Sequence, residues 1–299
     1  MGKLRLLFVY FLLAYTVHAQ TRGPFDLATA QVPAGARRIA YGTDPFQFGE
    51  LRVPDKPGPH PVAIVIHGGC WVSKLPNLDE RAVAMDNMRP LAAALTDAGI
   101  ATWNVEYRRI DNSGGGWPGT LQDVARAADF VRTLARANQL DLTRVIAIGH
   151  SAGGHLAMWL AARPKLSKSS ELYMKNPLRL SGVVDLDAPT DLKATIAVQQ
   201  PICGRPVITE LIGGSPDQQS RRYHDASPIE LLPLGVRQEV FGGQMFASQA
   251  APYETAAMKA GDSIHSIVLP KAGHFVFIDP QSDVWPQVIQ SVRRLLSMK

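Results

Sequence analysis

The chain has only two cysteines among its 299 residues, and a chain of this length can bury enough apolar surface to need no disulfide scaffold. Its lysines and arginines are scattered, with no basic block and no interleaved aromatic residues, which argues against a nucleic-acid-binding surface. Internal repeats and low-complexity tracts are absent. Beyond the N-terminus, no apolar run approaches the length of a membrane span. What remains is an ordinary globular composition, 46% hydrophobic and 19% charged.

The scarcity of cysteine leaves one possible pair, Cys70 and Cys203. The two could form a disulfide in an oxidising compartment, but a single pair is weak evidence for one. Cys70 follows two glycines in a turn where the backbone geometry matters most for the chemistry described below. We therefore expect two unpaired thiols.

The N-terminal segment has the layout of a secretory signal peptide. Two basic residues precede the apolar stretch Leu6–Val17, and Val17-His18-Ala19 offers small residues at the spacing of a cleavage site. We therefore predict a signal peptide over residues 1–19, a secreted or periplasmic protein, and no stable membrane span after cleavage. An uncleaved anchor is the alternative. Residues 20–36 are rich in glycine, proline and alanine and predict a flexible leader.

From residue 37 onward, strand patterns alternate with helical ones, which predicts a single α/β domain over 37–299. Such alternation implies a mostly parallel central sheet with helices on both faces. The pattern is irregular from about 192 to 225, where we expect a small cap or lid insertion. The expected strands are Phe46–Val53 (an edge strand), Val62–His67, Ile100–Val105, Val145–Gly149, Leu180–Leu186, Gln238–Phe241 and Ile264–Leu269, and the main helices are Leu91–Ala98, Leu121–Ala135, Ala152–Ala162, Pro252–Lys259 and Val284–Met298.

Residues 149–153 read Gly-His-Ser-Ala-Gly, directly after the apolar run 145–148. A G-x-S-x-G pattern between a buried strand and a helix is typical of a nucleophile elbow, which lifts the serine hydroxyl above the sheet edge. Glycines flank Ser151 because a β-carbon at 149 or 153 would collide with the neighbouring strand and helix. A tight glycine/serine turn without chemistry is the alternative interpretation.

Two further motifs suit a serine nucleophile. His67-Gly68-Gly69-Cys70-Trp71 follows an early strand, and its glycines would let backbone N–H groups turn inward. Together with the Ala152 amide, the amides of Gly68, Gly69 and Cys70 would form an oxyanion hole. Near the C-terminus, Gly273-His274-Phe275 follows the last expected strand, and His274 comes after the serine in the chain order of this type of triad. His274 is therefore the predicted general base.

Taken together, these motifs resemble the α/β-hydrolase superfamily, and within it the esterase/lipase branch with kynurenine formamidase-like and feruloyl-esterase-like (BD-FAE-type) enzymes. The similarity covers roughly residues 35–298. It implies the α/β-hydrolase fold and the hydrolysis of a carboxylic ester or a formamide without a metal or organic cofactor. The stretches that carry it are His67–Trp71, Glu106–Arg109, Gly116–Thr120, Gly149–Leu156 and Gly273–Phe275.

The third member of the expected triad departs from that resemblance. The family places an aspartate in the loop after the seventh strand, but no carboxylate lies between Glu239 and Glu254 in this chain. The best substitute is Asp187, at the carboxyl end of the preceding expected strand, where α/β sheets gather their sites. Asp185 lies deeper on the same strand face. A triad without an acid, in which Gln244 or water orients the imidazole, stays open.

The sequence thus predicts a secreted serine hydrolase of small acyl or aryl esters, with Ser151, His274 and Asp187 as its triad. Trp71 and Trp117 are candidates for lining the substrate pocket. An arylformamidase or amidase is the nearest alternative, because the same histidine can protonate a nitrogen leaving group. A catalytically weak binding protein that kept the fold is the other. We expect a small-molecule ester as the partner and neither a metal nor a cofactor; the oligomeric state is left open.

Overall fold

The structure is a computed structural model that describes residues 22–76 and 78–298. The expected signal peptide over 1–19 lies outside this part of the chain. Eight strands in the described residues form one sheet in the order β1-β2-β4-β3-β5-β6-β7-β8. The two pairings of β2 are antiparallel, and all the others are parallel. The strands are β1 (Arg37–Ala40), β2 (Phe48–Arg52), β3 (His60–Ile66), β4 (Ala101–Val105), β5 (Leu140–His150), β6 (Gly182–Leu186), β7 (Arg237–Gly242) and β8 (Ile264–Val268).

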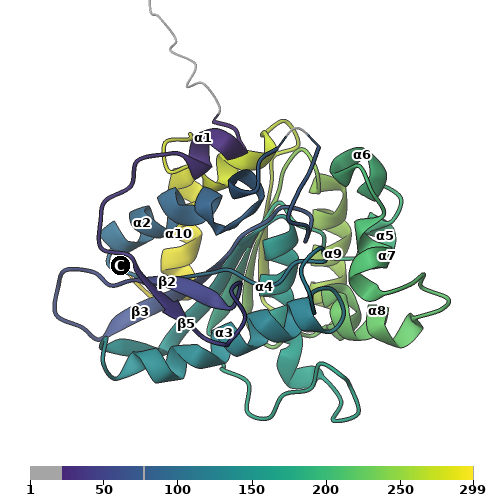
Figure 1. Ribbon diagram of the computed structural model, residues 1–299, viewed down its shortest axis with the longest axis horizontal. Helices are drawn as coiled ribbons and strands as arrows, with labels where there is room; N and C mark the ends of the chain where they lie inside the picture. The colour runs from purple at the N-terminus through teal and green to yellow at the C-terminus, as the bar shows by residue number, and fades with distance from the viewer. Residues whose placement is uncertain (1–21, 77, 299) are drawn as a thin grey trace, which may run out of the picture.

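Helices cover both faces of the sheet, as the alternation of patterns predicts (Figure 1). The central strand β3 is buried over its whole length, and its side chains divide by period two between the two cores. Val62, Ile64 and Ile66 pack into the core beneath α3 (Gly119–Ala135), α4 (Ala152–Ala162) and α9 (Ala247–Lys259). Ala63 and Val65 face α1 (Pro24–Ala28), α2 (Arg89–Asp97) and α10 (Trp285–Leu295). This arrangement is the α/β-hydrolase fold.

Two expectations about the N-terminal part were wrong. Strand β1 was not predicted, and because it pairs with β2, the expected edge strand has a neighbour on both sides. Within the expected flexible leader, Pro24–Ala28 forms helix α1, with proline at its start and Leu27 fully buried against α2. Because residues 20–36 are rich in glycine and proline, the short apolar segment Pro24–Ala28 was not predicted to pack on the core.

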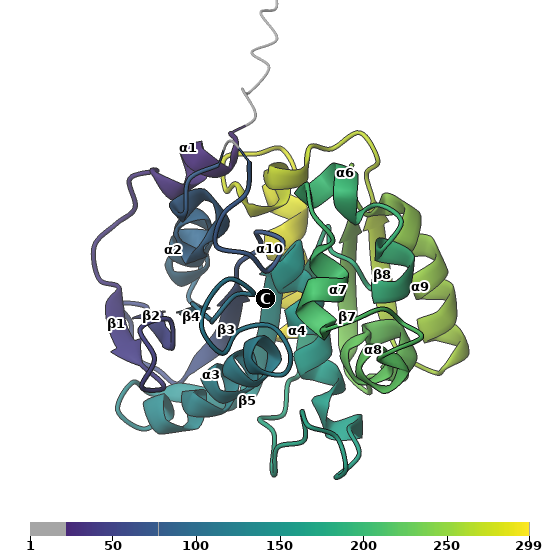
Figure 2. The same ribbon diagram turned by 45° about the vertical axis from the view of Figure 1, so that its right-hand side comes forward.

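The segment expected to form a cap lies between β6 and β7 and is built from short helices (Figure 2). These are α5 (Leu192–Thr195), α6 (Gln199–Cys203), α7 (Val207–Ile212) and α8 (Ser220–Ala226). Asp191 caps α5 by accepting hydrogen bonds from the amides of Lys193 and Ala194. Both views place this group of helices beside α9. Among the described residues, no helix is long and apolar enough to cross a membrane.

Candidate active site

Ser151 lies in the turn between β5 and α4 with φ of 54° and ψ of −124°. An L-residue rarely adopts such a backbone conformation, and its neighbours explain why it persists. A β-carbon on Gly149 would lie 2.1 Å from the carbonyl oxygen of Gly153, and one on Gly153 would lie 2.2 Å from that of Ile66. The elbow therefore packs directly against both its own helix and β3, as the flanking glycines predict.

The unusual backbone conformation is concentrated around this serine. Seven non-glycine residues in the described part of the chain have a positive φ, and four of them lie at this site: Cys70, Trp71, Ser151 and Asp187. Each such residue costs of order 1–3 kcal/mol, and strain of this kind gathers at functional sites.

His274 begins the short 3-10 helix η5 (His274–Ile278) and is buried, with 7% of its surface exposed. Its Nδ1 lies 2.6 Å from Oδ2 of Asp187, which is fully buried. The structure thus brings together the imidazole and the carboxylate that the sequence analysis named, across 87 residues of chain. Ser151 and His274 line the same cavity.

The loop after β7, in which the family usually carries its aspartate, binds the Asp187 carboxylate through backbone amides. The Asp187 backbone N–H donates to the carbonyl of Phe241 at the end of β7, and Oδ1 accepts the amides of Gly243 and Phe246 at 2.7 and 2.9 Å. These two backbone donors fix the position of the Asp187 carboxylate. The sequence analysis named Asp187 as the candidate acid but did not foresee these donors; Gly242-Gly243 directly after a strand was the available signal.

The rival carboxylates do not reach His274. Asp185 is fully buried, and neither of its oxygens forms a hydrogen bond of normal geometry within the described residues. Burial, reinforced by the charge of nearby Asp187, raises the pKa of Asp185 well above its usual range and favours the protonated form. Glu239 binds Arg294 and Ser291 instead.

The segment after β3 passes directly over the elbow. A β-carbon on Gly68 would lie 2.8 Å from the carbonyl oxygen of His150, and Gly69 has a φ of +100° that favours glycine. In the part of the chain described, the structure records no acceptor for the amide N–H groups of Gly69, Cys70 and Ala152. Unsatisfied donors beside a nucleophile are what an oxyanion hole requires.

A buried cluster supports this segment from below. The imidazole of His67 bonds to Glu106 at 3.0 Å and stacks on the ring of Tyr107, whose hydroxyl donates to the His67 carbonyl. Burial alone would raise the pKa of Glu106, but the charge and hydrogen bond of His67 and the charge of Arg109 outweigh it and lower that pKa. The Glu106-Tyr107-Arg108-Arg109 motif thus stabilises the turn after β3 through His67 and lines neither of the cavities beside Ser151.

The other histidines of the elbow are structural. His150 Nε2 lies 3.0 Å from the carbonyl oxygen of His274, and His155 Nε2 lies 2.9 Å from that of Ala226. Burial lowers the pKa of His155 to about 4, and burial together with the charge of His274 lowers the pKa of His150. Both rings are therefore neutral near pH 7, and His150 fixes the backbone from which the predicted base projects.

Two cavities flank Ser151. The smaller has a volume of about 10 Å³ and an almost entirely apolar lining. The larger, of about 100 Å³, contains His274. The smaller is lined by Cys70, Trp71, Ser151, Ala152, Pro189, Thr195, Gln199, Ile202, Cys203, Val207 and Phe246. The larger is lined by Gly69, Cys70, Leu75, Leu78, Ala82, Val83, Asn87, His150, Ser151, Ile202, Met245, His274 and Phe275.

The two tryptophans expected to line the substrate pocket lie in different places. Trp71 lines the smaller cavity, but Trp117 lines neither. Its indole N–H donates to Glu171 at 2.9 Å, and its ring lies 5.3 Å from the guanidinium carbon of Arg222. The glycine-rich loop that carries Trp117 directs it towards the loop after α4, away from Ser151, so this prediction was wrong.

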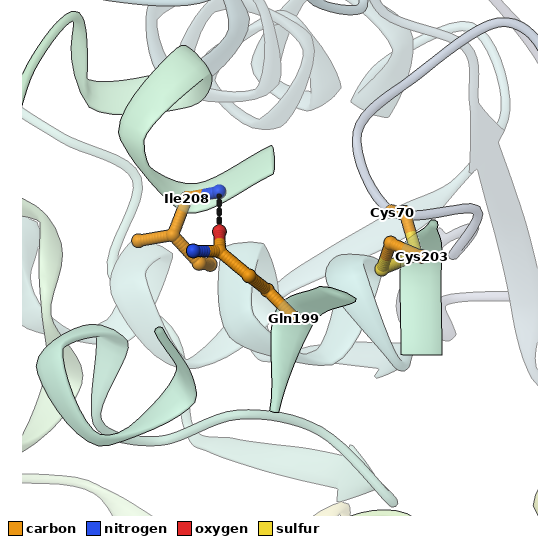
Figure 3. Close-up of a disulfide and its surroundings, with 4 residues drawn as sticks. All are labelled: Cys70, Gln199, Cys203 and Ile208. Atoms are coloured by element: carbon orange, nitrogen blue, oxygen red, sulfur yellow. Dashed lines mark hydrogen bonds between the residues drawn. A yellow bond between two sulfur atoms is a disulfide. The ribbon is translucent and has the colours of Figure 1, made fainter. Parts of the chain in front are cut away.

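The expectation of two unpaired thiols was also wrong, because Cys70 and Cys203 form a disulfide (Figure 3). Their Cα atoms lie 6.1 Å apart, within the normal range for such a bond, although 133 residues separate them in sequence. Helix α6 brings Cys203 against the turn after β3, and no local pattern shows this.

Nowhere in the described residues do three His, Cys, Asp or Glu side chains form a group that could hold a metal ion.

Comparisons with known proteins agree with this architecture. A family model described as BD-FAE matches residues 51–233. The truncated form of a carbohydrate esterase from gut microbiota has a TM-score of 0.72 at 20% identity, covering 89% of this chain and 100% of that one. Esterase 2 of Thermogutta terrifontis, phosphorylated by paraoxon, has a TM-score of 0.65 at 18% identity, covering 89% and 92%. At these identities the two structures show a shared fold.

One curated protein sequence matches over a short stretch. The non-reducing polyketide synthase adrD of Penicillium rubens is 34% identical over 110 residues. The match covers 34% of this chain and 4% of the synthase. It therefore carries nothing about the activity of the whole synthase to this chain.

Proposed function

We propose that this chain, which belongs to the BD-FAE family of esterases with the α/β-hydrolase fold, is a serine hydrolase that cleaves small carboxylic esters through an acyl-enzyme intermediate. The observation that carries the proposal is the buried pair of His274 and Asp187 on the cavity that also contains Ser151. This arrangement supports Ser151 as the nucleophile, His274 as the base and Asp187 as the orienting acid of an acyl transfer.

The proposed reaction proceeds in two halves. His274 Nε2 takes the proton of Ser151 Oγ as the oxygen attacks the ester carbonyl carbon, and Asp187 holds the Nδ1–H and stabilises the imidazolium. The amides of Gly69, Cys70 and Ala152 donate to the carbonyl oxygen as it gains negative charge. The imidazolium then gives its proton to the leaving alcohol. Water, deprotonated by the same histidine, releases the acid from Ser151 in the second half.

The position of His274 assigns the alcohol and the acyl group of the ester to different cavities. Because His274 must protonate the leaving oxygen, the alcohol occupies the larger cavity that His274 lines, and the acyl group occupies the smaller one. A formamide is the second candidate substrate, since a formyl group also fits a cavity of about 10 Å³. Because one structurally similar protein is a carbohydrate esterase, carbohydrate esters are further candidate substrates.

Secretion is part of the proposal. A cleaved signal peptide over residues 1–19 would deliver the chain to an oxidising compartment, and the Cys70–Cys203 disulfide is compatible with that destination. Mass spectrometry of the protein isolated from its host tests this, because cleavage after Ala19 gives a mature chain that begins at Gln20. Isolation of the full-length chain with free thiols would contradict it.

A fluorophosphonate probe tests the mechanism, since such probes phosphonylate activated serines with loss of fluoride. We expect labelling of one serine, mapped by peptide mass spectrometry to Ser151, with hydrolysis of p-nitrophenyl acetate or N-formylkynurenine. Ser151→Ala should abolish both labelling and turnover. Ser169→Ala, at an exposed serine, is the matched control and should retain both. An unlabelled wild-type protein without turnover would favour the binding-protein interpretation.

A further inference from the structure

Helix α6 ends in the Cys70–Cys203 disulfide (Figure 3). Residues of α6 and both cysteines line the smaller cavity beside Ser151. Cys203 is the last residue of α6, and Cys70 belongs to the turn that lines both cavities together with Ser151. Ile202, next to Cys203, lines both cavities. One covalent bond thus joins the wall of the acyl cavity to the proposed oxyanion hole.

The size of this cavity limits what can enter it. A volume of about 10 Å³ holds roughly one water-sized probe. The methyl group of an acetyl ester is close to that size, whereas a butyryl chain adds two further methylenes. Because the lining is almost entirely apolar, a longer chain is excluded by lack of room and not by polarity. A longer acyl group therefore requires the lining to move, and α6 supplies Gln199, Ile202 and Cys203 to that lining.

Few other contacts hold α6 in place. It has five residues, and a helix this short is not stable without tertiary contacts. Its outer side is exposed at Gln200 and Pro201, and Val198, which directly precedes the helix, is exposed as well. On the inner side, the side-chain oxygen of Gln199 accepts the amide of Ile208 at 2.8 Å, which ties α6 to α7 (Figure 3). That bond joins two helices of the same insertion.

Apart from packing, two links within residues 22–76 and 78–298 join the end of α6 to the turn after β3. One is the disulfide. The other is the ion pair of Arg205 with Asp111 at 2.9 Å, where the second carboxylate oxygen of Asp111 accepts the amide of Ser73. Both partners of this ion pair are about one-third exposed, so solvent screens it and its contribution is small. The disulfide is therefore the dominant link.

We propose that the Cys70–Cys203 disulfide determines acyl-chain specificity by clamping α6 over Ser151. With the bond intact, the cavity accepts formyl or acetyl groups and excludes butyryl and longer chains. Without it, α6 moves outward and longer chains enter. This inference rests on the proposed ester hydrolysis and adds the identity of the residues that set its acyl limit.

The test compares kcat/KM for p-nitrophenyl acetate, butyrate and octanoate in wild type and three variants. Cys203→Ser breaks the cross-link with little change in side-chain volume. Ile202→Ala widens the cavity and keeps the bond. Val198→Ala removes an exposed side chain from the same segment and is the control. Mass spectrometry of alkylated protein reports the state of the bond, and thermal melts report folding.

We expect wild type and Val198→Ala to prefer acetate. The butyrate-to-acetate ratio should rise by about tenfold or more in Cys203→Ser and in Ile202→Ala, because excluded methylenes are typically worth that much in a pocket. The ratio is the readout because a displaced Cys70 amide would slow all esters together. If Cys203→Ser does not fold, wild type treated with dithiothreitol replaces it: the reagent supplies two electrons and two protons, leaves two thiols and becomes a cyclic disulfide.

The outcomes separate this inference from the function on which it rests. An active enzyme whose chain-length ratio is unchanged after loss of the disulfide overturns the clamp and leaves the esterase standing. A wild type that prefers butyrate or octanoate does the same. A wild type that hydrolyses none of the esters and is not labelled at Ser151 overturns the proposed function itself.

Discussion

Asp187→Asn is the substitution that most directly tests the triad, because it keeps the shape of the side chain and changes the proton arrangement. The remaining oxygen can still accept the amides of Gly243 and Phe246, which now bind Oδ1. The new NH2 group then faces His274 Nδ1, where a carboxylate oxygen now lies at 2.6 Å. The imidazole must turn its Nδ1 into an acceptor and place its proton on Nε2.

That tautomer cannot accept the proton of Ser151. The expected loss is therefore on the order of 10⁴ in kcat/KM, which corresponds to about 5 kcal/mol of transition-state stabilisation. A hydrogen bond that merely held the ring in place would cost about 1–3 kcal/mol when broken, or roughly 5- to 150-fold. The two magnitudes differ enough to separate a role in proton transfer from a role in packing.

Hydrolysis of p-nitrophenyl acetate measures the loss, and a thermal melt shows whether the variant is folded. Asp185→Asn is the matched control on the same strand, because Asp185 does not contact His274, and its activity should stay within about tenfold of wild type. A folded Asp187→Asn enzyme within about threefold of wild type would refute the triad assignment. A loss in Asp185→Asn as large as in Asp187→Asn would refute it as well.

Three further predictions concern stability. The raised pKa of Asp185 means that the native state holds this proton more tightly than the unfolded state does, so the free energy of unfolding falls as pH rises above the unfolded pKa of about 3.9. Asp185→Asn removes this contribution. In denaturant unfolding, the stability of the variant relative to wild type should therefore grow with pH, by at most about 1.4 kcal/mol per pH unit. Leu27→Ala should lower the unfolding free energy by about 2–5 kcal/mol, whereas Phe25→Ala, half exposed on the same helix, should change it little; equal effects would mean that α1 is not docked. Gly153→Ala should destabilise the fold by about 1–3 kcal/mol, because its β-carbon meets backbone oxygens of β3 that cannot rotate away.

The disulfide and Trp117 show where sequence reasoning stopped. Cys70 was correctly placed in a turn of special geometry, with φ of 54°, but that observation was taken as a reason against pairing. The bond depends on where α6 lies, and α6 belongs to an irregular insertion without a periodic pattern. Trp117 lies at the end of a glycine-rich loop, whose direction no local pattern predicts.

Asp187 lies between these cases. The absence of a carboxylate from residues 240 to 253 is visible in the sequence, and so is an aspartate at the end of the preceding strand. Choosing between Asp185 and Asp187 requires the position of His274, which returns to the site from 87 residues away. The structure separates them: the Asp187 carboxylate is bound by backbone amides and His274, whereas the Asp185 carboxylate is buried and forms no hydrogen bond of normal geometry with the residues that the structure describes.

The sequence alone determined the parallel sheet, the elbow at Ser151 and the glycine turn opposite it. These features depend on steric limits and hydrophobic periodicity within a few residues, and such limits act wherever the chain is placed. Only the tertiary structure decided the partner of His274, the Cys70–Cys203 bond, the two cavities and the docking of α1. Each of these features joins segments that are far apart in the chain. Whether such segments meet depends on strand order and packing, which the sequence of a single segment does not determine.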